Sequence, residues 1–534
     1  MLQRLRWGAV RLVAAGLLVA CGTASGPGRS GWWRQAVVYE VFVRSFADSD
    51  GDGIGDLNGL TAHLDYLNDG DPGTTADLGV DAVWLMPIFP SPSYHGYDVT
   101  DYRSVNPQYG TAADFDAFVQ GAHQRGIKVI LDMVLNHSSS QHPWFLDSAQ
   151  GPAAARRDWY VWSPTDPGWY RPFGSGSDWY LLNGAYYYGI FSPAMPDLDL
   201  GNPAVEAELT DAMKSWLARG VDGFRLDAVR YYFASGPQAQ QDQPATHAFL
   251  RRIRQALQQV QPEALLVAEA WAPATIVASY YGQGDEVQLA FSFDLAGAIV
   301  TAGQTGDASG LTNRFADAQK SLAGKDPGFQ APFLTNHDQV RAYRAMGGDP
   351  GAARVAAATL LALPGTPFVY YGEEIGMQGG TSPDDRDKRT PFHWTAAGPG
   401  YGFTTGSSTW WPTPEATGVD AATQQADPAS LRALYGRLLA LRHRQAALAG
   451  GDASLPAATG GGSGLFALLR SAGAGRVLFV ANYAATPSGP FTVSGSGTPV
   501  ALESEGLAGA PVSAGGAVQF PGLAGRSFAF LSLE

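Results

Sequence analysis

The stretch GVDGFRLDAV (220–229) has the pattern of a short buried strand, yet it carries Arg225 and Asp227 near its carboxyl end. Side chains at positions i and i+2 of a strand point to the same face, so the two charges meet there. A buried ion pair rarely stabilises a core more than apolar packing does. A strand-end salt bridge and a functional site are both compatible with this stretch, and the rest of the chain has to decide between them.

Short apolar runs alternate with helix-like segments on both sides of this stretch. In 57–67, for example, leucines recur every three or four residues and form one apolar stripe. Continuously apolar strands separated by helices predict a parallel sheet, and eight such units predict a closed (β/α)8 TIM barrel of the α/β class. A doubly wound open sheet is the alternative, but no glycine-rich phosphate loop follows the first strand. The expected strands are 36–43, 81–88, 128–134, 223–229, 264–270, 289–294, 332–336 and 367–372.

Two segments depart from the barrel pattern. Residues 138–197, rich in Trp, Tyr, Gly and Pro, are too long for an ordinary connection and predict a small subdomain inserted after the third strand. Residues 450–534, rich in Gly, Ala and Ser with short strand patterns, predict a C-terminal antiparallel β domain, a β-sandwich. The barrel is then expected to occupy 32–137 and 198–445.

The composition is that of a globular protein with an ample core: 534 residues, 45% hydrophobic and 16% charged. This length allows one large barrel domain with additions. The formal net charge of −14 disfavours binding to nucleic acid or to anionic lipid through a general positive field. A neutral substrate or bound cations are compatible with it.

The N-terminus has the layout of a targeting segment. Three arginines precede the apolar run 12–20, which is too short to span a bilayer. The run ends at Cys21, the only cysteine, and residues 1–20 resemble a bacterial lipoprotein signal, which implies a lipid-modified Cys21 followed by a flexible tether at 21–31. An ordinary secretory peptide with an incidental cysteine is the alternative. We expect an exported protein, either lipid-anchored to the bacterial cell envelope or extracellular, that meets a membrane only through this anchor.

Polar residues cluster where the expected strands end. The active site of a (β/α)8 barrel lies at the carboxyl ends of its strands. Three of the carboxylates, Asp227, Glu269 and Asp338, follow different strands and are expected to meet at that rim, and two carboxyl groups flanking a bond are what glycosidic cleavage requires. Any one of them alone is more often a helix cap or a solvated charge. These strand-end residues are Asp132, Asn136, His137, Arg225, Asp227, Glu269, Asn336, His337 and Asp338.

Four of these strand ends resemble the signature regions of the α-amylase superfamily of glycoside hydrolases, in the family's order. The resemblance extends over residues 32–445 and implies a barrel enzyme that cleaves glucosidic bonds with retention of configuration. The matching segments are DMVLNH (132–137), GFRLDAV (223–229), EAW (269–271) and FLTNHD (333–338), supported by SYHGYDVTDY (93–102) and MPDLDL (195–200).

The resemblance implies roles for three carboxyl groups. Asp227 would attack the anomeric carbon, Glu269 would protonate the leaving oxygen, and Asp338 would stabilise the oxocarbenium-like sugar. Arg225 is expected to lower the pKa of Asp227, whereas an apolar surrounding with Trp271, or the charge of Asp338, is expected to keep Glu269 protonated. For a retaining enzyme the carboxyl groups of Asp227 and Glu269 should be about 5 to 5.5 Å apart.

The resemblance also implies sugar contacts. His137 and His337 would bind hydroxyls at the cleavage point, with His95 and Arg225 nearby, and Tyr97 would stack on the sugar face. These assignments depend on the motifs, because a lone histidine is usually structural. Other aromatic residues are candidate sugar platforms, although we expect most of them to serve packing. They include Trp144, Trp159, Tyr186, Tyr187, Tyr188 and Trp410.

A second constellation is DSDGDGIGD (48–56). Aspartates alternating with glycines give oxygen ligands on a tightly turning loop, which suits Ca²⁺. The loop matches an EF-hand only at its start, because Gly59 stands where a bidentate Glu is required. A solvated acidic turn is the alternative. The resemblance to relatives near oligo-1,6-glucosidases implies the ligands Asp48, Asp50, Asp52, the carbonyl of Ile54, and Asp56.

The choice among superfamily members depends on weaker signals. Ala228 after the expected nucleophile favours α-1,4 linkages by resemblance, and MPDLDL (195–200) resembles the branch intermediate between oligo-1,6-glucosidases and neopullulanases, although Asp199 departs from its usual pattern. We expect a monomeric, endo-acting α-amylase on starch and maltooligosaccharides, with some transglycosylation. An exo-acting α-glucosidase or oligo-1,6-glucosidase, a trehalose synthase, and a non-catalytic glycan-binding lipoprotein are the alternatives.

Overall fold

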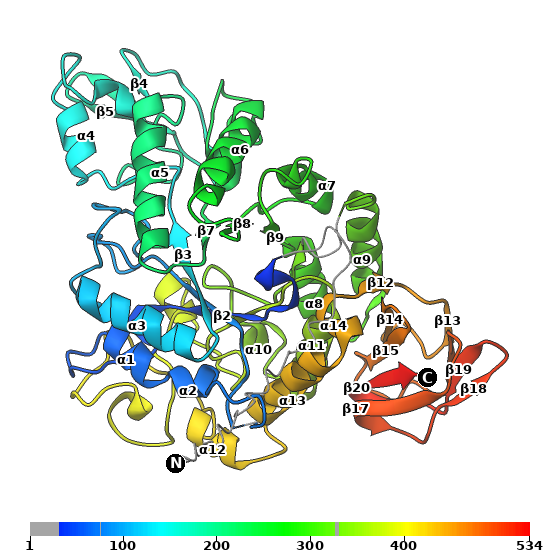
Figure 1. Cartoon of the computed structure of the whole chain (residues 1–534). Helices are drawn as coiled ribbons and strands as arrows, with labels where there is room; N and C mark the ends of the chain where they lie inside the picture. The colour runs from blue at the N-terminus through cyan, green and yellow to red at the C-terminus, as the bar shows by residue number, and fades with distance from the viewer. Residues whose placement is uncertain (1–30, 75, 326–329) are drawn as a thin grey trace, which may run out of the picture. The chain divides into compact units, whose positions relative to one another are not determined.

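The computed structural model describes residues 31–74, 76–325 and 330–534 (Figure 1). The chain divides into two compact units, Met1–Gly31 and Trp32–Glu534, and the fold described below belongs to the second. The expected signal segment 1–20, Cys21 and the tether as far as residue 30 lie outside the described residues. Among the residues that are described, no helix is long and apolar enough to cross a membrane.

The described residues include a sheet of eight parallel strands in the order β10, β9, β8, β7, β3, β2, β1, β11. Two backbone hydrogen bonds join its outer strands, from Thr366 N to Gln330 O (2.9 Å) and from Phe368 N to Pro332 O (2.8 Å). The sheet is therefore nearly closed, which confirms the predicted (β/α)8 barrel. Its strands are β1 Val38–Val41, β2 Ala82–Leu85, β3 Lys128–Met133, β7 Gly223–Leu226, β8 Leu265–Ala268, β9 Leu289–Phe291, β10 Gln330–Ala331 and β11 Phe368–Tyr370.

The seventh barrel strand differs from its prediction. We expected it at 332–336, but β10 covers only Gln330–Ala331. Pro332 has no N–H group with which to continue the ladder. The apolar residues Phe333 and Leu334, which suggested a strand, are buried just beyond β10. The apolar run therefore predicted the burial of these residues correctly, but it was wrong in predicting that they pair with a neighbouring strand.

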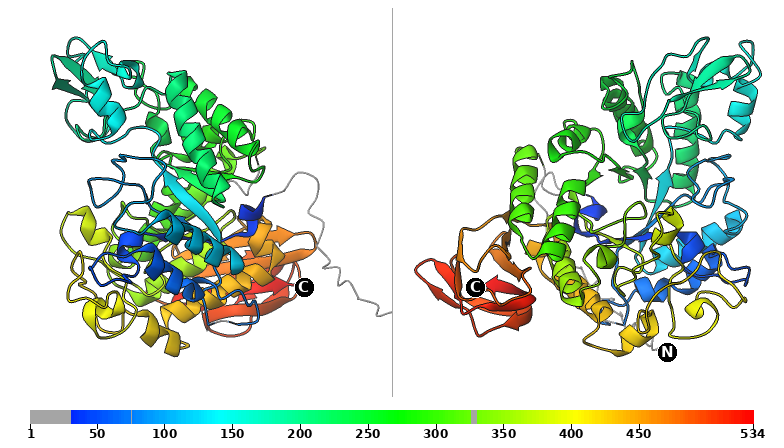
Figure 2. Two further views of the ribbon diagram at one scale, coloured as in Figure 1. Left: turned by 60° about the vertical axis from the view of Figure 1, so that its left-hand side comes forward. Right: turned by 180° about the vertical axis from the view of Figure 1, so that it is seen from behind.

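Helices surround the sheet (Figure 2). Thr111 and Asp114 form a capping box at the start of α3, and proline occupies the first turn of α5, α6 and α11. The stripe at 57–67 forms two short helices because His63 leaves the helical backbone conformation, with φ −111° and ψ 13°. The helices are α1 Leu57–Ala62, α2 Leu64–Leu67, α3 Ala112–Gln124, α4 Pro143–Ser148, α5 Pro203–Ala218, α6 Pro244–Gln258, α7 Ala274–Val277, α8 Phe293–Thr305, α9 Ser309–Ser321, α10 Ala342–Ala345, α11 Pro350–Ala362, α12 Ala421–Ala426, α13 Leu431–Arg444 and α14 Ala446–Gly450.

Aromatic rings fill the inside of the barrel. Phe291 packs against Trp84 and Phe368, with ring centroids 5.4 and 4.9 Å apart, and all three are buried. Trp84 in turn contacts His337 at 5.7 Å and the guanidinium of Arg225 at 5.2 Å. The apolar filling of the barrel therefore supports the polar residues at its carboxyl-terminal rim directly.

A small antiparallel sheet lies between β3 and α5, as predicted from the overlong connection. Its strands, in the order β4, β6, β5, lie beside α5 (Figure 2). The ring of Phe145 in α4 contacts Tyr160 and Tyr187 at 5.0 Å each, which explains the high aromatic content of this segment. The strands are β4 Trp162–Ser163, β5 Trp179–Leu182 and β6 Ala185–Tyr188.

The C-terminal segment forms two antiparallel sheets, in the orders β12, β14, β15, β20, β17 and β13, β16, β19, β18, as predicted. Tyr483 donates a hydrogen bond to Thr359 of α11 (2.6 Å), and Arg470 donates one to the carbonyl of Ala362 (2.6 Å). The strands are β12 Asp452–Ser454, β13 Ala458–Gly460, β14 Leu465–Ala472, β15 Gly475–Asn482, β16 Phe491–Ser494, β17 Pro499–Leu507, β18 Val512–Ala514, β19 Ala517–Phe520 and β20 Leu523–Leu533.

The aromatic side chains of this C-terminal segment are all buried, so none of them offers a ring to a sugar on its surface. Together with the contacts to α11, this burial favours a structural role for the two sheets. The seven aromatic residues are Phe466, Phe479, Tyr483, Phe491, Phe520, Phe528 and Phe530.

Candidate active site

Arg225, at the end of β7, connects three carboxylates at the carboxyl-terminal rim. The strand register places it beside Asp132 of β3, and its Nη1 donates to Asp132 Oδ1 (2.8 Å) and to Asp227 Oδ1 (2.7 Å). Its Nη2 lies 2.9 Å from Glu269 Oε2, just beyond β8. The guanidinium is completely buried. Arg225 and Asp227 therefore belong to a converging polar site and do not form an isolated salt bridge.

Asp338 has a cation of its own on the other side of this site. Arg389 Nη2 donates to Asp338 Oδ1 (3.0 Å), and Arg389 Nε donates to the carbonyl of His337 (3.0 Å). The Nε2 atom of His337 lies 3.3 Å from Asp338 Oδ2. Asp338 is thus held in a different electrostatic environment from Asp227 and Glu269.

His337 and Tyr97 form the base of the site. His337 is completely buried between Glu40, whose Oε1 is 2.6 Å from Nδ1, and the hydroxyl of Tyr97, which is 2.6 Å from Nε2. The two rings stack with centroids 5.6 Å apart. The Tyr97 hydroxyl also donates to Asp132 (3.1 Å). These contacts fix the orientation of Tyr97 at the cavity.

A cavity of about 800 Å³ opens above these groups. It brings together six of the predicted residues, His95, Tyr97, His137, Asp227, Glu269 and Asp338. Arg225 and His337 are fully buried and hold these residues from behind instead of lining the cavity. His137 Nε2 is buried and has no hydrogen-bond partner among the described residues, so a polar group of a ligand would satisfy it.

Several residues of the cavity wall were not among the site residues predicted from the sequence. Trp271 was considered only for its effect on Glu269, and the loop residues carry no periodic pattern that would single them out. None of the six platform candidates lines the cavity in the described structure; Trp144, for example, packs against His142 with centroids 4.1 Å apart. The additional wall residues include Phe173, Phe191, Arg230, Tyr231, Gln241, Trp271, Asp385 and Arg389.

Burial and charge compete for the protons of the three carboxyl groups. Burial raises the pKa of Asp227 to about 7, although Arg225 acts in the opposite direction. Arg225 lowers this pKa, as expected, but burial outweighs the ion pair and the net shift is upward. Burial also raises the pKa of Glu269 to about 7. The pKa of Asp338 is lowered instead, because its contacts with His337 and Arg389 outweigh burial.

The second predicted site gathers three carboxylates of the loop after β1. Oxygens of Asp48, Asp50 and Asp56 lie within 4.8 Å of one another. Like charges this close repel one another, and a divalent cation bound by hard oxygen ligands would remove the repulsion. Asp52, which we expected in the same set, is exposed and outside this group, and its Oδ1 accepts a hydrogen bond from Ile54 N (2.7 Å).

Glycine is required in this loop for a close approach to another segment. Gly53 has φ +91°, and a Cβ there would lie 2.6 Å from the carbonyl oxygen of Ser408. Its N–H donates to Asp48 Oδ2 (2.8 Å), and the N–H of Gly51 donates to Asp48 Oδ1 (2.7 Å). The backbone thereby holds the Asp48 carboxylate in place before any ion arrives.

Calcium added back after treatment with a chelator is expected to stabilise the protein. At a calcium concentration 100 times Kd, the free energy of unfolding should rise by about 2.7 kcal/mol, because the ion binds only the folded loop. Asp50→Asn should lose most of this gain, whereas Asp52→Asn, its matched control, should keep it. Thermal melts with EGTA and with added calcium measure both, and identical melts in the two conditions would contradict a cation site.

Comparisons with known proteins agree with this geometry. The family model described as "Alpha amylase, catalytic domain" matches residues 40–451. Alpha-amylase 3 of Dictyoglomus thermophilum is 39% identical over 426 residues, or 79% of each chain. The trehalose synthase/amylase of Mycolicibacterium smegmatis is 38% identical over 415 residues, 69% of this chain and 68% of that one. A crystal structure of an α-amylase from H. orenii matches with a TM-score of 0.82 and 37% identity over 94% of this chain and 100% of that one.

The nearly closed barrel and the carboxylates at its rim are those of a (β/α)8-barrel glycoside hydrolase. The family match covers more than half of the chain, and the curated relatives are more than 30% identical over more than two thirds of it. The chain therefore belongs to the α-amylase family and is an enzyme of that family, whose members act on α-glucans as hydrolases or transglycosylases.

Proposed function

We propose that this protein hydrolyses α-1,4-glucosidic bonds inside starch and maltodextrin chains with retention of configuration, and that it also transfers glycosyl groups to sugars. The observation that carries the proposal is the pair Asp227 and Glu269, which share one guanidinium and face one cavity of about 800 Å³. That volume is much larger than a single glucosyl unit, which supports action on a polymer. Two of the relatives described above are named as α-amylases.

The contacts at the site divide the work between the two carboxyl groups. Oδ1 of Asp227 is engaged by Arg225, which leaves Oδ2 to attack the anomeric carbon. Oε2 of Glu269 accepts the N–H of Ala228 (2.9 Å) and contacts Arg225, which leaves Oε1 to carry the proton for the leaving oxygen. Asp338, held ionised by its own cation, stabilises the positive charge that develops on the sugar.

The backbone at Ala228 supports this arrangement. Ala228 adopts φ 51° and ψ 36°, a left-handed conformation that is uncommon for a residue with a Cβ. In this conformation its N–H points to Glu269, so the residue that follows the nucleophile also holds the acid. Strain of this kind persists where the surrounding structure fixes it, and functional sites are the usual place.

Several finer assignments are part of the proposal. Ala228 and the segment 195–200 support α-1,4 specificity and the branch between oligo-1,6-glucosidases and neopullulanases by resemblance. The oxygen ligands of the loop after β1 support Ca²⁺ as its ion. The layout of residues 1–20 supports export and lipid attachment at Cys21. A polymer that cannot enter the cell requires an enzyme outside it.

The products formed from maltoheptaose test the proposal. Time-resolved proton NMR follows both product length and anomer, using a soluble form of the chain that starts after Cys21. Short maltooligosaccharides that appear first as α-anomers are expected. Glucose alone would identify an exo-acting α-glucosidase, and trehalose formation from maltose would identify a trehalose synthase. An unchanged spectrum from folded, calcium-loaded protein would favour a binding protein.

The pH profile of kcat/KM is expected to be bell-shaped with its maximum near neutral pH. Catalysis needs one proton on the pair: below the optimum Asp227 becomes protonated and cannot attack, and above it Glu269 loses the proton that the leaving oxygen requires. The raised pKa values of about 7 place both limbs near neutrality. Initial rates on maltoheptaose between pH 4 and 10 measure the profile, and an optimum below pH 5 would contradict it.

A further inference from the structure

Glu40 is a carboxyl group inside the barrel. It lies on β1 two residues after Val38, which packs with Trp84 and Phe291 in the barrel interior, so both side chains point inward. Only 2% of Glu40 is exposed. Large apolar side chains normally fill such positions, and a carboxyl group there is costly unless a polar partner compensates it. The presence of Glu40 therefore requires a partner.

His337 is that partner. Oε1 of Glu40 lies 2.6 Å from Nδ1 of His337, which is completely buried. Among the described residues, no arginine or lysine lies within ion-pair distance of Glu40. Arg225 contacts three other carboxylates, and Arg389 contacts Asp338. The other charged or titratable groups around Glu40 are Asp132, Arg225, Asp338 and Tyr370.

The contacts of His337 indicate where its protons lie. The hydroxyl of Tyr97 carries a single proton, which it donates to Asp132 Oδ2 (3.1 Å). The contact of 2.6 Å between the same hydroxyl oxygen and Nε2 of His337 therefore needs a proton on Nε2. The ionised Asp338 carboxylate, with Oδ2 3.3 Å from Nε2, can only accept and favours the same proton.

A proton on Nε2 leaves two forms for the pair of Glu40 and His337. Either a neutral His337 accepts at Nδ1 from a protonated Glu40, or a doubly protonated His337 donates to an ionised Glu40. Both forms hold one proton between Oε1 and Nδ1, and neither carries a net charge. Burial raises the pKa of Glu40 well above its ordinary value and lowers the pKa of His337, which favours the first form.

We propose that Glu40 is a positioning residue, which holds His337 in the form with a proton on Nε2. This N–H then keeps the Tyr97 hydroxyl and the ionised Asp338 carboxylate in place at the site. The inference rests on the proposed function, in which Asp338 stabilises the positive charge on the sugar. Without Glu40, the ring of His337 could carry its proton on Nδ1, and the lone pair of Nε2 would face the carboxylate of Asp338. The loss would be felt in the transition state, where the positive charge develops.

Two substitutions at Glu40 separate this role from the filling of space. Glu40→Leu has no proton to give to Nδ1 of His337, and it should lower kcat on maltoheptaose about 10- to 100-fold, the usual effect of losing one hydrogen bond to a charged group. KM should change less than about threefold, because the lost interaction acts in the transition state. Glu40→Gln can donate its amide N–H to Nδ1, so it should keep kcat within about threefold of wild type.

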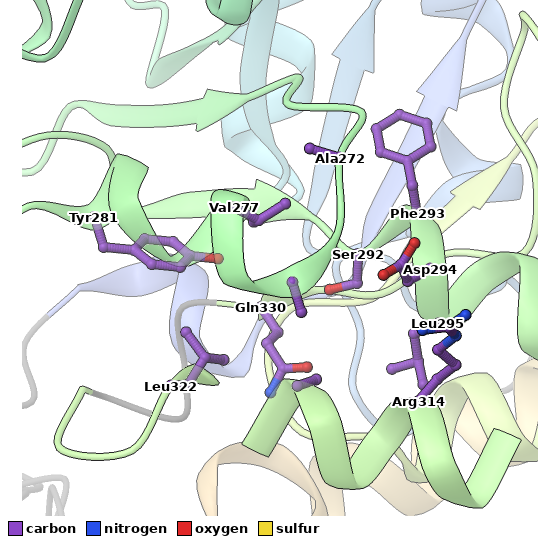
Figure 3. Close-up of a pocket in the computed structure, with 12 residues that line it drawn as sticks. Ala272, Val277, Tyr281, Ser292, Phe293, Asp294, Leu295, Arg314, Leu322 and Gln330 are labelled. Atoms are coloured by element: carbon purple, nitrogen blue, oxygen red, sulfur yellow. The ribbon is translucent and has the colours of Figure 1, made fainter. Parts of the chain in front are cut away.

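Asp294→Asn is a control outside the site. Asp294, in the first turn of α8, and Gln330 of β10 line a separate cavity among α7, α8 and α9 (Figure 3). The control removes a carboxylate that contacts neither Glu40 nor His337. Its kcat, its KM and its His337 signals should equal those of wild type.

Nitrogen-15 NMR of the histidine rings measures the proton positions directly and does not depend on activity. The soluble form that starts after Cys21 is labelled at histidine, and His337→Asn identifies the signals of His337 among the nine histidines. Wild type and Glu40→Gln should show a protonated Nε2. In Glu40→Leu a substantial fraction of the molecules should carry the proton on Nδ1 instead.

Three results would each overturn the inference: an unprotonated Nε2 in the wild type, an unchanged His337 spectrum or an unchanged kcat in folded Glu40→Leu, and a kcat loss above about tenfold in folded Glu40→Gln. If Glu40→Leu does not fold, the wild type and Glu40→Gln still decide the question. A wild-type protein that shows the expected spectrum but does not cleave maltoheptaose would instead overturn the proposed function, so the two failures are distinguishable.

Discussion

Asp227→Asn is expected to lower kcat/KM for maltoheptaose by at least about 10⁴-fold and to leave the fold intact. An amide cannot form the glycosyl ester, and loss of a nucleophile typically has effects of this order. The asparagine oxygen can still accept the hydrogen bond from Arg225, which now joins Nη1 to Asp227 Oδ1 at 2.7 Å. The variant is therefore expected to lose activity because it cannot form the glycosyl ester, and not because its structure changes.

The stability of this variant gives an independent check. Because burial raises the pKa of Asp227 to about 7 in the folded protein, the folded state holds the proton more tightly than the unfolded state, whose aspartate has a pKa of about 4. Stability therefore falls as pH rises through the window from about 4 to 7. Asparagine has no such dependence, so the variant should melt at or above the wild-type temperature at pH 8. Retained hydrolysis by this variant would eliminate the catalytic assignment.

Glu269→Gln is expected to show a loss that depends on the leaving group. General acid catalysis contributes about 10² to 10⁴-fold, so kcat/KM for maltoheptaose should fall by about that factor. Fluoride leaves without a proton, and kcat/KM for α-maltosyl fluoride should fall much less. The geometry favours a clean substitution, because the glutamine carbonyl can take the place of Oε2 and accept the N–H of Ala228.

Added azide is expected to restore turnover by the Glu269→Gln variant. The second step also uses Glu269, which must take a proton from water, so the variant should accumulate the glycosyl intermediate on α-maltosyl fluoride. Azide is already an anion and needs no base. Added azide should therefore raise turnover and give α-maltosyl azide, which mass spectrometry and NMR identify. Equal losses on both substrates, with no azide product, would rule out the acid–base role.

Much of the fold could be predicted because it depends on local patterns of apolar residues in the sequence. Apolar runs separated by helical stripes predicted seven of the eight barrel strands at their observed positions, and the excess length of 138–197 predicted the small inserted sheet. The errors arose where a single residue overrides a pattern. Pro332 ends a ladder that its apolar neighbours would extend, and His63 interrupts a leucine stripe whose spacing is otherwise regular.

The site was predicted in part for a related reason. Residues at strand ends are placed by the barrel itself, so Asp227, Glu269 and Asp338 could be expected to converge. Arg389 lies in a long loop without periodicity, and only the folded structure brings its guanidinium to Asp338. The proton affinity of Asp227 was also beyond prediction, because Arg225 is visible in the sequence whereas the depth of burial, which outweighs it, depends on the whole barrel.

A row of contacting rings leads from Phe291 inside the barrel through Phe293 to Trp271. It links the stability of the barrel core to the shape of the active-site cavity, two properties that protein engineers usually treat separately. A laboratory selection for altered product profiles would be expected to find changes at Phe291 and Phe333 as well as in the cleft, since both contact Phe293. Conversely, substitutions at Phe291 or Phe333 that are selected for thermostability would also change the orientation of the Trp271 ring. Libraries designed for heat tolerance should therefore be sorted by sugar products, too.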